Sequence, residues 1–141
     1  MSYNSSAVIN ITNNTGGNAI ITLAHRYCDD IPQVNSVKMG LEATAEILTA
    51  NFNSGFFISG MNCWWIGIQV LNGPNAGHYT IEGSSENPVV ENLLESDDKR
   101  TSINFTVNTE AFTMNSFAGS VSTEVISVSD AISMDNFFAA A

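Results

Sequence analysis

Apolar and polar residues alternate with a period of two in short runs along this chain, and this alternation restricts the fold more than any other feature. Residues 7–12 read AVINIT, so nearly every second residue is apolar. Similar runs occupy 19–27, 45–52 and 101–108, and turn sequences such as NNTGG at 13–17 separate them. Runs of this kind are typical of β-strands that bury one face.

The spacing of these runs predicts the fold class. About eight short strands with turn signals at intervals of roughly ten residues indicate an all-β protein, an antiparallel β-sandwich in one domain over 1–128. We expect the runs at 7–12 and 19–27 to form a hairpin and residues 28–36 to form a loop. At most one short helix is expected, near 88–95, because Pro88 suits the first turn of a helix.

Two adjacent tryptophans lie in the run at 62–71. Because neighbouring residues of a strand point to opposite faces, Trp64 and Trp65 cannot both enter the same core. Trp64 shares its face with apolar residues and is the expected core member, whereas Trp65 shares its face with polar and small ones. The alternation in each run gives the residues that we expect to face the core together with Trp64. They are Ala7, Ile9, Ile11, Ile21, Leu23, His25, Tyr27, Ile66, Ile68, Val70, Ile103, Phe105 and Val107.

The charge of the chain excludes one class of partner. Four lysines and arginines stand against fourteen acidic residues among 141, a formal net charge of −10. No basic patch can be built from so few cations, so we expect no nucleic-acid binding. Charged residues make up only 13% of the chain, about half the usual share, so Asn, Ser, Thr and Gly must form most of the surface.

The N-terminal residues MSYNSSAVIN contain neither a basic segment nor an apolar core of the signal-peptide type. A cytoplasmic location is therefore the default expectation, with unconventional export as the alternative. In that compartment the two cysteines, Cys28 and Cys63, are expected to be thiols, and a single bridge between them is the alternative.

Aromatic residues provide the candidates for binding. Trp65 beside Gly67, with Phe56 and Phe57 upstream, is suited to an exposed aromatic platform that contacts a protein or a lipid. Tyr27 is a further candidate binding residue. The competing interpretation is that Trp65 lies beneath a loop or beneath the C-terminal tail.

The tail, residues 129–141, departs from the strand pattern and carries Phe137 and Phe138. Exposed phenylalanines favour aggregation unless they dock on a surface. The tail is therefore expected to dock on its own domain or on a second copy, which makes Phe137 and Phe138 the candidate residues for self-assembly.

Catalytic chemistry has little support in the sequence. His25, Cys28, Asp29 and Asp30 cluster, but an H-x-x-C spacing alone does not make a metal site, and we expect neither a metal nor a cofactor. The simpler interpretation is a histidine at a strand end that is bonded to a loop. A pair formed by either cysteine with either histidine would need an oxyanion hole that the sequence does not indicate. The prediction is that the protein is not an enzyme.

Several short motifs resemble a known family. They are Thr15-Gly16 in a turn, the segment His25-Arg26-Tyr27-Cys28-Asp29, and Gly60-Met61-Asn62-Cys63-Trp64-Trp65. Over residues 7–128 the chain resembles the domain family of nematode proteins up-regulated in long-lived insulin-pathway mutants (PUD-type), although Asn62 stands where that family has an acid. The resemblance implies a β-sandwich similar to aegerolysins, small proteins that bind membrane lipids, and it implies no enzymatic activity.

Two functions follow as expectations. The first is a non-enzymatic β-sandwich module that binds a protein partner or a membrane lipid through aromatic loops. The second is a structural subunit that assembles into homo-oligomers or filaments through edge strands and the C-terminal tail. The solution mass of the full chain and of a chain ending near Val128 distinguishes these two functions.

Overall fold

The computed structural model describes residues 3–27, 31–53, 62–81, 90–92, 102–116 and 119–129. Over these ranges the protein is all-β, as predicted, and none of the described elements is a helix that could span a membrane. The strands are β1 (Ser5–Asn13), β2 (Ala19–Tyr27), β3 (Gln33–Met39), β4 (Thr44–Phe52), β5 (Asn62–Val70), β6 (Gly77–Ile81), β7 (Val90–Asn92), β8 (Ser102–Val107), β9 (Ala111–Ser116) and β10 (Gly119–Val128). The tail beyond residue 129 lies outside the described residues.

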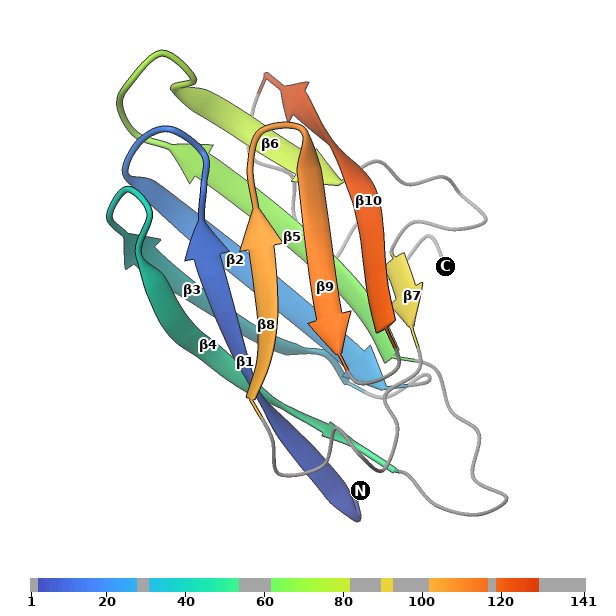
Figure 1. Cartoon of the computed structure of the whole chain (residues 1–141). Helices are drawn as coiled ribbons and strands as arrows, with labels where there is room; N and C mark the ends of the chain where they lie inside the picture. Colours follow the sequence, from blue (N-terminus) through green and yellow to red (C-terminus); the bar gives the residue numbers. More distant parts are fainter. Residues whose placement is uncertain are drawn as a thin grey trace.

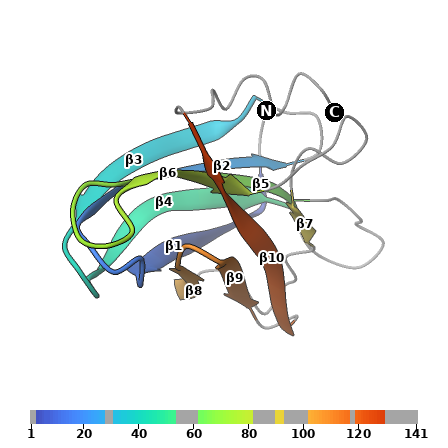
Figure 2. The same cartoon turned by 90° about the horizontal axis from the view of Figure 1, so that it is seen from above.

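The strands form one mixed sheet that folds back on itself. Its order is β3-β2-β5-β6-β10-β9-β8-β1-β4, with β7 paired to β5. Two layers result: β3, β2, β5 and β6 form the first, and β4, β1, β8 and β9 form the second (Figure 1). Strand β10 joins them, because it pairs with β9 over Gly119–Glu124 and with β6 over Val125–Val128 (Figure 2).

The two ends of the sheet, β3 and β4, meet along a seam that amide side chains bridge. Asn35 Nδ2 donates to the Ile47 carbonyl at 2.6 Å, and Gln33 Nε2 donates to the Thr49 carbonyl at 2.7 Å. The Asn51 backbone N–H donates to Gln33 Oε1 at 2.9 Å. These bonds occupy edge groups that could otherwise pair with another chain. The sheet is therefore nearly closed.

Several predicted details of the sheet are wrong, and long-range pairing explains each of them. Strand β1 pairs in parallel with β8 and antiparallel with β4, so the sheet is not purely antiparallel and the hairpin between 7–12 and 19–27 does not form. The turn after β1 instead carries the chain to the other layer. Strand β3 begins at Gln33 and so takes up the last part of the segment predicted to be a loop, because it pairs with β2 along its whole length.

The predicted short helix near 88–95 is also replaced by a strand. Val90–Asn92 pairs with Asn62–Trp64 of β5, where β6, which pairs only with Gly67–Val70, does not reach. This stretch of β5 pairs with β2 on one side, and β7 gives it a partner on the other. The pairing outweighs the helix start that Pro88 favours. The remainder of the 88–95 segment lies outside the described residues.

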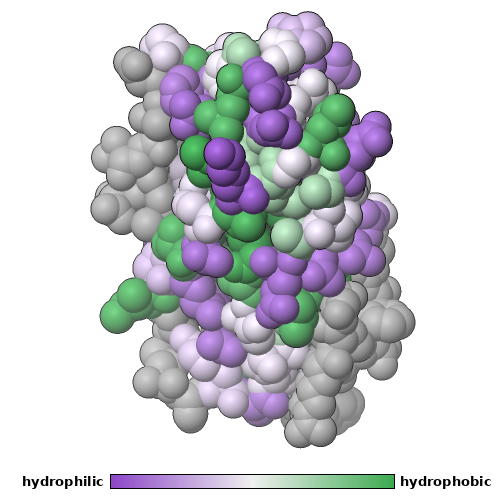
Figure 3. Space-filling view, turned by 90° about the vertical axis from the view of Figure 1, so that its left-hand side faces the viewer, coloured by the Kyte–Doolittle hydropathy of each residue, from purple (hydrophilic) through white to green (hydrophobic). Residues whose placement is uncertain are grey.

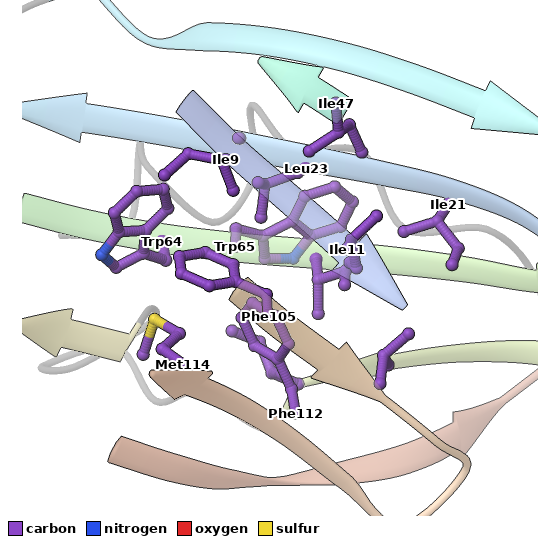
Figure 4. Packing of buried hydrophobic residues seen from close by; sticks show 14 of the residues in the cluster. Ile9, Ile11, Ile21, Leu23, Ile47, Trp64, Trp65, Phe105, Phe112 and Met114 are labelled. Atoms are coloured by element: carbon purple, nitrogen blue, oxygen red, sulfur yellow. The ribbon is translucent and has the colours of Figure 1, made fainter. Parts of the chain in front are cut away.

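The core between the layers follows the predicted strand faces. Trp64 is fully buried on β5, and its ring meets that of Phe105 on β8 edge to face at a centroid distance of 4.9 Å. Phe105 in turn meets Phe112 at 5.5 Å (Figure 4). The other predicted core residues of β1, β2, β5 and β8 are buried as well, which confirms the alternation analysis for these strands.

Candidate functional site

Both candidate binding residues that the structure describes, Trp65 of the predicted platform and Tyr27, are buried. Trp65 is 3% exposed and Tyr27 is 8% exposed. The indole of Trp65 folds over the neighbouring glycine, since a Cβ atom at Gly67 would lie 2.6 Å from its Cη2 atom. Of the two interpretations left open for Trp65, the structure therefore favours burial over an exposed platform. Phe56, Phe57, Phe137 and Phe138 lie outside the described residues.

The most polar part of the interior is centred on His25. Strand pairing places His25 opposite Gln33 on one side and opposite Trp64 on the other. Its Nε2 lies 2.6 Å from Asn62 Oδ1, and its Nδ1 lies 3.0 Å from Gln33 Oε1. The Trp64 ring lies against the imidazole at a centroid distance of 4.5 Å. His25 is thus bonded to strands β3 and β5, whereas the sequence suggested a bond to a loop.

Burial favours the neutral form of this histidine. Desolvation lowers the pKa of His25, and the hydrogen bonds with Asn62 and Gln33 raise it by less. A neutral imidazole donates from one nitrogen only, so one of the facing amides must present its NH2 group. Gln33 is held in place by its bonds to β4, and among the described residues Asn62 Nδ2 has no partner. An Asn62 amide whose NH2 group donates to Nε2 gives both ring nitrogens of His25 a hydrogen-bond partner.

The position and bonding of His25 give it a structural role. It is 1% exposed, and both of its ring nitrogens lie against side chains of neighbouring strands. Through Gln33 it connects β2 to the seam, because the same Gln33 oxygen also accepts the backbone N–H of Asn51 on β4. The centre formed by His25, Gln33 and Asn62 therefore ties three strands of the first layer to the edge of the second.

This centre predicts a loss of stability in acid. In the unfolded chain His25 takes up a proton near its ordinary pKa of 6.5, whereas the lowered pKa in the folded protein opposes this uptake. The free energy of unfolding should therefore fall as the pH decreases below about 6.5, until the folded-state pKa is reached. Urea unfolding from pH 7.5 to 4.5 measures the effect.

One substitution separates this histidine from other acid-labile groups. His25→Gln should flatten the pH dependence, because it removes the titrating imidazole from the centre. An unchanged pH dependence in His25→Gln would contradict this account of the centre.

The other candidate ligands do not assemble into a described metal site. Cys28, Asp29 and Asp30 lie outside the described residues, and Cys63 is buried on β5. In the part of the chain that the structure describes, no group of three His, Cys, Asp or Glu side chains is placed to hold a metal ion.

The outer face of the second layer carries an ordered array of uncharged polar side chains. Strand register places Asn10, Asn104, Asn115 and Ser120 in one row across β1, β8, β9 and β10. A second row crosses β4 as well. Its members are Thr44, Thr12, Thr106, Thr113 and Ser122. We call these nine residues the amide–hydroxyl face.

The amide–hydroxyl face is open to solvent and partly locked by its own hydrogen bonds. All nine side chains are exposed or half-buried. Strands β1, β8 and β9, which carry most of them, lie toward the viewer in Figure 1. The hydroxyls of Thr12 and Thr44 share a hydrogen bond of 2.7 Å, and Ser120 Oγ donates to Asn115 Oδ1 at 2.5 Å. The hydroxyls of Thr113 and Ser122 share one of 3.1 Å.

Charged residues occur only at the margin of these rows. Glu46 on β4 pairs with Asn10 and so continues the first row beyond it. All nine members of the face are neutral, in a chain whose formal net charge is −10. An uncharged partner can therefore approach these nine side chains without displacing water from carboxylates.

A different side of the molecule exposes scattered apolar residues. Figure 3 views the side where β3 and β4 lie and shows apolar side chains interrupted by polar ones. The large apolar residues that are most exposed in the described ranges are separate along the chain: Ile31, Val34, Leu41 and Leu71. Single exposed apolar residues are ordinary on protein surfaces, so they do not indicate a docking patch.

The amide–hydroxyl face was not predicted from the sequence. Alternation identified the outward positions of each strand, but not which strands are neighbours. Only the parallel pairing of β1 with β8 brings Asn10 level with Asn104, and Thr12 level with Thr106. The signal in the sequence was the recurrence of outward Asn and Thr two residues apart, in NIT at 10–12 and in NFT at 104–106.

Comparison with known proteins gives no match to a protein-family model and no significant match to a curated protein. The functional interpretation therefore depends on the geometry of the chain itself.

Proposed function

We propose that this protein is a non-enzymatic binding module that engages its partner with the amide–hydroxyl face. The observation that supports the proposal is the register of two uncharged rows across neighbouring strands of one layer. Hydroxyl and amide groups both donate and accept hydrogen bonds, so such rows can match a partner of either polarity. Hydrogen bonds within the face already restrain several of these side chains, which lowers the entropic cost of binding.

The interpretation as a binding module agrees with the resemblance to the PUD-type family and to aegerolysin-like sandwiches. Two layers of strands that face one another across a single core support classification as a β-sandwich, although the layers share β10. Within this proposal the aromatic loops have a smaller part than the sequence suggested, because Trp65 and Tyr27 are buried. Membrane lipid remains the partner that the resemblance favours.

A self-assembling subunit is the second candidate. Copies of a chain with a net charge of −10 repel one another, and the neutral face lets two copies approach without bringing carboxylates into contact there. Assembly through the β3–β4 edges has less support, since amide side chains already occupy edge groups there.

One substitution tests the binding proposal across partner classes. Asn104→Asp exchanges an exposed amide at the centre of the face for a carboxylate of the same shape. We expect it to weaken whatever the wild-type protein binds in a panel of lipid vesicles, polysaccharides and, by light scattering, its own copies. Binding that is equal in wild type and Asn104→Asp would contradict the proposal.

A further inference from the structure

The chemistry of the amide–hydroxyl face selects among partner classes. We propose that it binds an extended, uncharged polysaccharide that lies across the strands, an inference that depends on the proposed function above. Sugar hydroxyls donate and accept hydrogen bonds, as the nine side chains do. A polyanion such as a nucleic acid or a sulfated glycan is repelled by the net charge of −10.

The spacing of the face suits a repeating partner. Neighbouring strands lie about 4.8 Å apart, so each row presents one polar side chain per strand at that interval. One sugar unit of an extended β-linked chain advances by a similar length. The second row runs from Thr44 on β4 to Ser122 on β10 and so spans four strand intervals. A polysaccharide chain above this row can therefore place successive units over successive strands.

The side chains of the face favour hydrogen bonding to the sugar edge over stacking on its ring. All nine are Asn, Ser or Thr, and the hydroxyl pairs Thr12–Thr44 and Thr113–Ser122 are already oriented by hydrogen bonds. Because single bonds of this kind contribute little net free energy in water, affinity must come from many units bound at once. Long or insoluble polymers should therefore bind better than single sugars.

The test is sedimentation of the purified full chain with insoluble cellulose, chitin and β-1,3-glucan. We expect the wild-type protein to sediment with at least one of them. Asn104→Asp should bind roughly tenfold more weakly, because a carboxylate loses the two amide donors and must be dehydrated on contact. Thr106→Val, which removes one hydroxyl from the second row with little change in shape, should also weaken binding.

A matched control lies on the other layer. Gln69→Glu makes the same amide-to-carboxylate change at an exposed strand position of β5, and it should bind as the wild type does. Circular dichroism and thermal unfolding of each variant exclude loss of the fold as the cause of weaker binding.

The outcomes separate this inference from the broader proposal. If the wild-type protein sediments with none of the three polymers, the inference is overturned, and lipid vesicles or self-association that respond to Asn104→Asp would still support the binding face. If a polymer binds wild type and Asn104→Asp equally, both the inference and the proposed function are overturned.

Discussion

Replacing Trp64 by alanine is expected to lower the free energy of unfolding by about 4 kcal/mol, the cost of a large cavity in a packed core. Trp64 is fully buried between the two layers. Its ring contacts His25 within the first layer and Phe105 across the core. Its loss should therefore weaken both the packing of the layers and the polar centre. Urea unfolding followed by circular dichroism measures the change.

Trp64→Phe is the control for this cavity. It retains an aromatic ring on the same core face and should cost less than half as much as the alanine variant. A change below about 1 kcal/mol for Trp64→Ala would show that the layers do not depend on this residue, and would contradict the core described above.

The second large effect is expected at Gly17, in the turn between β1 and β2. A Cβ atom there would lie 2.2 Å from the Asn72 carbonyl oxygen, a backbone atom of the turn between β5 and β6. The two turns cannot easily separate, because the Asn18 N–H donates to Asn72 Oδ1 at 2.9 Å and the Leu71 N–H donates to the Asn18 carbonyl at 2.7 Å. Gly17→Ala should lower the free energy of unfolding by about 3 kcal/mol.

Gly40 provides the control for this substitution. It also lies in a turn at this end of the molecule, but a Cβ atom there would meet nothing nearer than Asn18 Oδ1 at 3.9 Å. Gly40→Ala should therefore change the stability by less than about 0.5 kcal/mol. Equal losses for the two variants in urea unfolding would show that the close approach at Gly17 is not what limits the turn.

The strands and their buried faces could be predicted from the sequence because alternation is a local signal. Ile103, Phe105 and Val107 are buried as the period of two requires. Pairing is not local: β1 and β8 are nearly ninety positions apart, and nothing in either strand specifies a parallel neighbour. The β3 strand was missed for a related reason, since its polar residues Gln33 and Asn35 serve the seam with β4.

The candidate sites could likewise be predicted only where a local signal was enough. That His25 faces the core was predictable from its position on β2, but its partners Gln33 and Asn62 come from strands whose placement was unknown. Asn62 was noted only as a departure from a family that has an acid there. An acid would pair with a charged His25, whereas the amide suits a neutral one. The burial of Trp65 depends on Gly67, a neighbour whose absent side chain leaves room for the indole.

The amide–hydroxyl face was out of reach of sequence reasoning because it is a property of strand order. Its nine residues come from five strands, and each strand contributes only one or two. Outward Asn and Thr are usually explained by solvent exposure alone. Their alignment into continuous neutral rows is what distinguishes this surface.

The central claim, that the amide–hydroxyl face is the binding surface, is tested most directly by nuclear magnetic resonance. A soluble hexamer of β-1,4-linked glucose is added to ¹⁵N-labelled protein, and the side-chain NH2 signals of the asparagines are followed. The account predicts shifts for Asn10, Asn104 and Asn115 on the face, and none for Asn18 and Asn75 in the turns at the end of the molecule. Shifts confined to the turn asparagines, with those of the face unchanged, would contradict it.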